Sequence, residues 1–91
     1  MSNQGVNRFL DPEGRVKQWP KKFSDKLEVL NYLASKFDAT ITYDEKSVNE
    51  LLKRWHTFGD WSLLRRDMYE QGFIDRNRAG TEYTRTTKIL D

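Results

Sequence analysis

K-R-W-H-T-F-G-D-W-S-L-L-R-R, residues 53–66, is the segment that decides how this chain folds. One continuous helix through it would place Gly59 and Asp60 in the helix interior. Glycine costs about 1 kcal/mol there relative to alanine, and aspartate favours helix caps over helix interiors. We therefore predict a short turn over residues 56–59, followed by a helix that has Asp60 as its N-cap and runs to about Gln71. The segment is then the corner of a helix-turn-helix.

Two further helices are predicted upstream of this corner. Ser24 is placed to cap a helix over residues 25–37, and Asp44 is placed to cap another over residues 45–55. Apolar residues recur in both segments at the spacing typical of an amphipathic helix. The expected inward positions are Leu27, Leu30, Leu33, Ala34 and Phe37 in the first helix, Val48, Leu51, Leu52 and Trp55 in the second, and Trp61, Leu64 and Met68 in the third.

Short runs of β-branched and aromatic residues predict a small sheet. Residues 73–77 and 81–85 flank a glycine-bearing turn and indicate a β-hairpin. Residues 40–43, T-I-T-Y, form another run of the same kind and would join the hairpin as a third strand.

The start of the chain carries its own turn signal. Asp11-Pro12-Glu13-Gly14 suits a type I turn, and its flanks predict an extra N-terminal β-hairpin over residues 8–20. Residues 1–7 are polar and indicate a loose terminus.

The order helix, short strand, helix, turn, helix, hairpin is that of a winged helix-turn-helix. We therefore expect an α+β fold that is winged helix-turn-helix-like, with three helices plus a small antiparallel sheet and the N-terminal β-hairpin as an addition. A chain of 91 residues makes a single domain over residues 1–91. Within it we expect the N-terminal hairpin at 8–20, the winged-helix core at 24–85 and a tail at 86–91.

Several short motifs also resemble a known bacterial family. They are G-R-V-K-Q-W-P (14–20), V-L-N-Y-L-A-S-K-F (29–37), V-N-E-L-L-K-R-W-H (48–56), L-R-R-D (64–67) and Y-E-Q-G-F-I (69–74). Together they make the region from about Phe9 to Arg85 similar to the bacterial domain of unknown function 2087. The resemblance implies that relatives occur alone or joined to winged-helix transcription regulators. The family has no established activity, so the resemblance transfers no functional residue. Where the family pattern has a charged residue in its capping box, this chain has Ser47.

Composition limits the chemistry that this chain can perform. It has no cysteine and a single histidine, which excludes a disulfide framework and a thiolate zinc site. Its glycines are scattered at turns and form no phosphate-binding loop. A nucleophile near His56 would have to be Thr57 or Ser62, and neither has an activating context. We expect no catalytic residues, no enzyme activity, no cofactor and no metal. The short apolar runs and the absence of an apolar leader indicate a cytoplasmic protein without membrane contact.

The outward face of the third helix carries the side chains best suited to nucleic acid. Arginine can bind guanine with two hydrogen bonds, and serine or tyrosine can contact bases or phosphates. We therefore expect a transcription-regulator-type domain that binds double-stranded DNA, with the hairpin and the second helix touching the backbone. The candidate nucleic-acid-binding residues are Lys46, Lys53, Arg54, Ser62, Arg65, Arg66, Tyr69, Arg76, Arg78 and Arg85.

Charge leaves an alternative open. The net charge is only +2, and residues 44–91 hold nine basic and nine acidic side chains. A helix or sheet face that carries charges of both signs is often simply exposed to solvent. The alternative is a non-catalytic protein-interaction or sensory module on the same fold, with a protein partner at the aromatic and basic surface around Trp19. We expect a monomer or a weak homodimer in either case.

Overall fold

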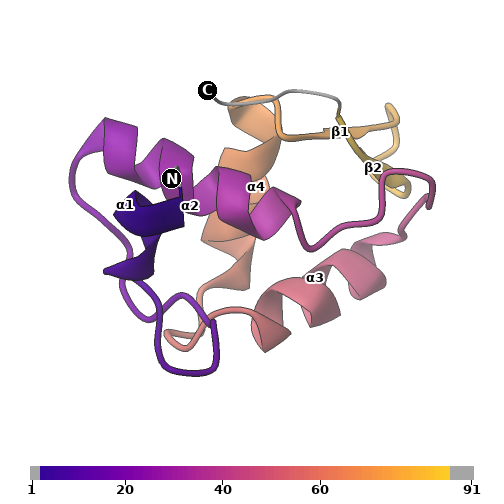
Figure 1. Cartoon of the computed structure of the whole chain (residues 1–91). Helices are drawn as coiled ribbons and strands as arrows, with labels where there is room; N and C mark the ends of the chain where they lie inside the picture. The colour runs from indigo at the N-terminus through magenta and orange to yellow at the C-terminus, as the bar shows by residue number, and fades with distance from the viewer. Residues whose placement is uncertain (1–2, 87–91) are drawn as a thin grey trace.

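The computed structural model describes residues 3–86 and is α+β, with four helices and one two-stranded antiparallel sheet in that range (Figure 1). The helices are α1 (Asn3–Asn7), α2 (Phe23–Ala34), α3 (Glu45–Arg54) and α4 (Trp61–Glu70), and the strands are β1 (Ile74–Arg76) and β2 (Tyr83–Arg85). The predicted tail at 86–91 lies outside the described residues except for Thr86. No helix among residues 3–86 has the length and apolar character needed to cross a membrane.

The corner between α3 and α4 is confirmed. Gly59 has a φ of 72°, a left-handed conformation that L side chains rarely adopt. The carboxylate of Asp60 accepts a hydrogen bond from the backbone N–H of Leu63 at 3.4 Å and so caps α4. Gly72, with a φ of 83°, follows the other end of α4. The chemistry of two glycines and one aspartate therefore fixes both ends of this helix.

The bounds of α2 differ from the predicted ones and need correction. The helix begins at Phe23 with Lys22 in the N-cap position, so Ser24 lies inside it and does not cap it. It ends at Ala34, because the hydroxyl of Ser35 donates to a main-chain carbonyl and the next residues tighten into a turn. Phe37 lies beyond the helix but is still buried.

The sheet is smaller than predicted. Strand β1 pairs with β2 in antiparallel register, with Asp75 opposite Thr84. The expected third strand at 40–43 is reduced to one bridge, in which Tyr43 and Tyr83 exchange backbone hydrogen bonds of 2.8 and 2.7 Å. The preceding residues cannot extend the pairing, because the side chain of Asp38 holds them in a turn.

The N-terminal prediction is wrong for residues 3–7 and correct only in part for residues 8–20. Residues 3–7 form the short helix α1 where a loose terminus was expected. The extra β-hairpin over 8–20 is reduced to one antiparallel bridge between Leu10 and Val16, flanked by a backbone hydrogen bond from Lys17 to Phe9 at 2.8 Å. Val16 also pairs with the corner: its N–H donates to the carbonyl of Trp55 at 2.8 Å, and its carbonyl accepts from Thr57 at 2.9 Å. Val16 therefore joins the short local pairing to a distant segment of the chain.

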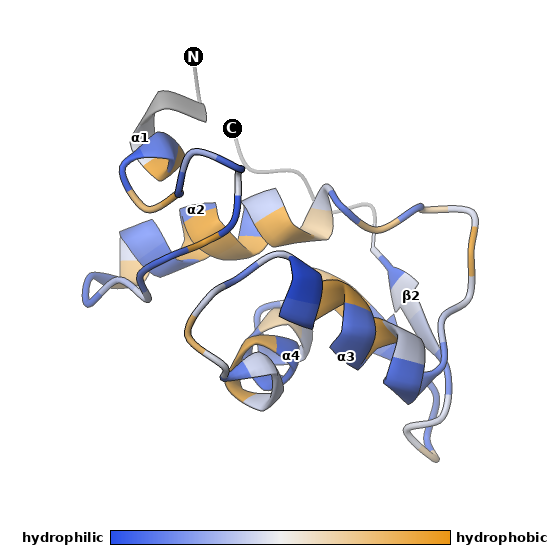
Figure 2. Cartoon of the chain, turned by 90° about the horizontal axis from the view of Figure 1, so that it is seen from below, coloured by the Kyte–Doolittle hydropathy of each residue, from blue (hydrophilic) through white to orange (hydrophobic). Residues whose placement is uncertain are grey.

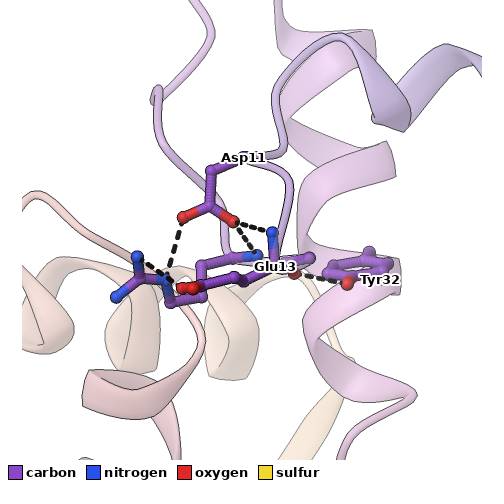
Figure 3. A network of polar contacts seen from close by, with 5 residues as sticks. Asp11, Glu13 and Tyr32 are labelled. Atoms are coloured by element: carbon purple, nitrogen blue, oxygen red, sulfur yellow. Dashed lines mark hydrogen bonds and ion pairs between the residues drawn. The ribbon is translucent and has the colours of Figure 1, made fainter.

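The predicted turn over residues 11–14 is present, because the N–H of Gly14 donates to the carbonyl of Asp11 at 3.0 Å, and a network of polar contacts surrounds it (Figure 3). One carboxylate oxygen of Asp11 accepts from the backbone N–H groups of Glu13 and Arg15, at 2.9 and 2.8 Å, and the other accepts from Nε of Arg15 at 2.8 Å. These hydrogen bonds lower the pKa of Asp11 below its ordinary value, the bond from the Arg15 backbone most of all. The hydroxyl of Tyr32 on α2 donates to the carbonyl of Gly14. The loop is thereby fixed to α2.

One core joins the helices and the hairpin. Figure 2 shows the hydrophobic side of α2 turned toward α3 and α4. Trp55 and Trp61 are only half-buried and pack at the edge of the core. The largest side chains with less than 2% of their surface exposed are Val16, Val29, Leu30, Leu33, Phe37, Val48, Leu52, Leu64, Met68, Phe73 and Ile74. The outward side chains of α4 and most of the hairpin are exposed to solvent. The hairpin lies on the opposite side of the molecule from α1, with α4 between them (Figure 1).

Candidate nucleic-acid interface

A cleft of about 460 Å³ lies between the exposed face of α4 and the hairpin. Residues 62–70 and 76–83 supply its walls, so the two elements that flank Gly72 form it together. The lining is mostly polar or charged, with three arginines against one glutamate. Its residues are Ser62, Arg65, Arg66, Tyr69, Glu70, Arg76 and Tyr83.

Arg76 connects the hairpin to α4 across this cleft. Its guanidinium lies 4.4 Å from the centre of the Tyr69 ring, in a cation–π contact. Hydrogen bonding with the phenol groups of Tyr69 and then of Tyr83 raises the pKa of Arg76 above its ordinary value. Among the described residues, no carboxylate lies within ion-pair distance of Arg76. Its charge is therefore held in place by aromatic rings and not neutralised by an acid.

Arg65 has a mainly structural position. Its side chain is 23% exposed, donates a hydrogen bond to the amide oxygen of Asn49 on α3, and lies 3.9 Å from Glu45. These contacts join the N-terminal half of α3 to α4. Only part of the guanidinium is left to face the cleft.

Arg66 is much more accessible. Its side chain is 64% exposed, and its nearest acid is Asp67, whose carboxylate lies 3.8 Å from Nε. An exposed ion pair of that length contributes about 0–1 kcal/mol and is easily exchanged for another anion. Glu70, one helical turn further on, is also exposed and brings a negative charge to the cleft.

The other predicted residues lie away from the cleft. Arg85 donates to the carbonyl of Phe37 at 3.1 Å and so fastens β2 to the end of α2. The ammonium of Lys53 lies 4.3 Å from the centre of the Trp61 ring. Lys46, Arg54 and Arg78 are exposed, on α3 for the first two and in the hairpin turn for the third. The structure thus brings together Ser62, Arg65, Arg66, Tyr69 and Arg76 from the predicted set.

Two cleft residues were not identified from the sequence. Tyr83 is buried yet contributes to the wall of the cleft, because strand β2 alternates its side chains between core and solvent and the large ring extends to the cleft. Glu70 is also absent from the predicted set, although it lies on the same helix as Arg66. Its i+4 spacing from Arg66 was the signal that could have placed both on one surface.

The single histidine has a structural place. The ring of His56 is 4% exposed, and Nδ1 donates to the carbonyl of Leu52 while Nε2 accepts from the backbone N–H of Asp60 at 2.9 Å. Both ring nitrogens are therefore occupied by the main chain. Among residues 3–86, no group of three or more histidine or acidic side chains is placed to hold a metal ion.

Comparison with known proteins gives one match. The model of a family described as uncharacterized proteins conserved in bacteria (DUF2087) matches residues 15–85. No curated protein and no solved structure matches the chain. The matched range covers α2, α3, α4 and the hairpin, and it begins after α1 and the Asp11 turn.

Proposed function

The chain belongs to the DUF2087 family of uncharacterized bacterial proteins, and we propose that it is a winged-helix domain of the transcription-regulator type that binds double-stranded DNA. The order of α2, α3, α4 and the hairpin supports this proposal. In such domains the last helix enters the major groove and the helix before it crosses the backbone. Here α4 takes the first role, α3 the second, and the hairpin is the wing.

The observation that carries the proposal is the cleft between α4 and the hairpin. It places Ser62, Arg66 and Tyr69 on one exposed surface with Arg76 of the wing. Cationic and hydroxyl side chains are the groups that bind phosphate oxygens and base edges. The overall charge of residues 44–91 is zero, so DNA binding depends on this local grouping and not on a general excess of positive charge.

A salt titration with duplex DNA tests the proposal. Log affinity is expected to fall steeply as log salt concentration rises, because phosphate contacts release counterions. Arg66→Ala and Arg78→Ala should each weaken binding and make the salt dependence shallower by about one unit of slope. Lys21→Ala, an equal loss of charge at the far end of the molecule, serves as the matched control. Absence of duplex binding at low salt would remove the proposal.

A second candidate is a protein-interaction or sensory module on the same fold. It is favoured by Phe23, which is 59% exposed beside Lys21 and Lys22. Aromatic residues are enriched at protein-binding surfaces. This candidate predicts that Phe23→Ser leaves the free domain folded and removes partner binding, with no effect on DNA.

A further inference from the structure

The cleft has the size of a small-molecule site but not the lining of an ordinary one. Its volume of about 460 Å³ falls within the range of roughly 300–1,000 Å³ that holds such ligands. Most pockets of that size are predominantly apolar, whereas this one is formed mainly by charged and hydroxyl side chains. A bare inorganic anion would fill only a part of it. The ligand should therefore be both anionic and larger than a single ion.

Two arginines approach the cleft from different elements. Arg66 projects from α4 with 64% of its side chain exposed, and Arg76 comes from β1. Arg76 is already held over the ring of Tyr69 at 4.4 Å, so little side-chain freedom is lost when it binds an anion. Guanidinium groups match the geometry of phosphate oxygens and donate two parallel hydrogen bonds to them.

The remaining lining suits the rest of a nucleotide. The ring of Tyr69 is 37% exposed beside the guanidinium of Arg76, and a sugar or base can pack against such an aromatic surface. The hydroxyl of Ser62 and the carboxylate of Glu70 are exposed on the same helix and can accept hydrogen bonds from sugar hydroxyls or base amino groups.

We propose that the cleft binds one nucleotide unit, with its phosphate held by Arg66 and Arg76 and its sugar and base beside Tyr69. The unit has two sources, a strand of nucleic acid or a free mononucleotide, and the shared chemistry is the phosphate ester. The inference rests on the proposed function in taking α4 and the hairpin as the nucleic-acid face.

The test uses the full chain and three probes: inorganic phosphate, deoxyadenosine 5′-monophosphate and a short DNA duplex. Two-dimensional NMR follows backbone amides and arginine Nε–H groups during each titration. The mononucleotide should shift the signals of Arg66, Tyr69 and Arg76 to saturation, and inorganic phosphate should bind more weakly at the same place. Arg66→Gln and Arg76→Gln should each weaken mononucleotide binding about tenfold, the effect of losing one charge-assisted hydrogen bond. Lys21→Gln, with the same change of charge, should alter it less than about twofold.

Two results would overturn the inference. One is a set of shifts spread over distant lysines, and the other is wild-type mononucleotide affinity in Arg76→Gln with its thermal unfolding unchanged. The duplex separates this inference from the proposed function. Mononucleotide binding without duplex binding supports the cleft as a site for free nucleotides and removes the DNA proposal. Duplex binding that both arginine variants leave unchanged keeps DNA binding and removes the cleft.

Discussion

The backbone N–H of Asp60 donates a hydrogen bond of 2.9 Å to Nε2 of His56. The same ring donates from Nδ1 to the carbonyl of Leu52 in the last turn of α3. One buried side chain therefore binds a carbonyl in the last turn of α3, which also accepts from the N–H of Trp55, and satisfies an orphan N–H at the start of α4. The imidazole fixes the geometry of the corner by joining both ends.

His56→Ala is expected to lower the free energy of unfolding by about 3 kcal/mol, because it leaves a cavity and the N–H of Asp60 without its partner. Thr57→Ala, an exposed change in the same turn, should lower it by less than about 0.5 kcal/mol. Urea unfolding followed by tryptophan fluorescence measures both. Equal effects of the two substitutions would show that the corner does not depend on the imidazole.

Substitution of Gly59 tests the effect of backbone conformation on stability without a change in side-chain packing. Its φ is 72°, and a Cβ atom added there would meet no atom within 4 Å. Gly59→Ala should therefore cost about 1–2 kcal/mol of unfolding free energy through the left-handed conformation alone. Gly59→Asn should cost less, because asparagine tolerates this region better. If thermal unfolding finds alanine and asparagine equally stable, local strain is not what the glycine relieves.

The corner was predictable because its determinants are local. A glycine with positive φ and an aspartate cap act within four residues, and the pattern Gly59-Asp60 shows both. The N-terminal segment was not predictable for the opposite reason. Val16 pairs with Trp55 and Thr57, some forty residues away in sequence, and no short-range pattern indicates such a partner. Lys22 occupies the N-cap position of α2 although its side chain makes no cap hydrogen bond. It lies ahead of Ser24, the better capping residue, which is inside the helix.

In the candidate site, too, local patterns were predictable and contacts between distant residues were not. The helical spacing of Ser62, Arg66 and Tyr69 predicted that they share one face, and they do line one cleft. The partner of Arg85 is the carbonyl of Phe37, a tertiary contact that spacing cannot indicate. Arg65 was also read as a free cation, although it is engaged by Asn49. Periodicity finds the face, but it does not find which of its cations are occupied.

Adjacent arginines on α4 should therefore respond differently to substitution. Arg65→Ala removes the hydrogen bond to Asn49 and is expected to lower the free energy of unfolding by about 1–2 kcal/mol. Arg66→Ala should change it by no more than about 0.5 kcal/mol, because the side chain is 64% exposed. Chemical unfolding of the two variants compares them directly. A larger loss of stability in Arg66→Ala would contradict these assignments.

The cap of α3 makes part of the stability depend on pH. Hydrogen bonds from the hydroxyl and then the backbone N–H of Ser47 lower the pKa of Asp44 below its ordinary value. A lowered pKa in the folded state means that Asp44 adds stability above its ordinary pKa and loses this contribution as pH falls through the lowered value. Asp44→Asn keeps an acceptor at the cap but does not titrate.

The variant Asp44→Asn should therefore have a shallower decline of stability in acid than the wild type. Unfolding midpoints in urea, measured from neutral pH down to about pH 2, provide the comparison. Asp11 and Asp38 also have lowered pKa values, so the wild-type decline should be reduced and not abolished. Parallel curves for the two proteins would mean that the cap does not contribute to acid sensitivity.

Among residues 3–86, Glu70 is the one carboxylate that lines the cleft, and its removal should strengthen anion binding. Glu70→Gln keeps the shape and the hydrogen-bonding groups while it removes a negative charge that opposes phosphate. Duplex affinity at low salt is expected to rise about threefold to tenfold, and the difference should shrink as salt screens the interaction. Glu50→Gln, an exposed change of equal charge on α3, is the control for general electrostatics. If the two variants gain affinity equally, DNA responds only to the net charge of the protein. A gain confined to Glu70→Gln instead places the bound phosphate next to α4 and the hairpin.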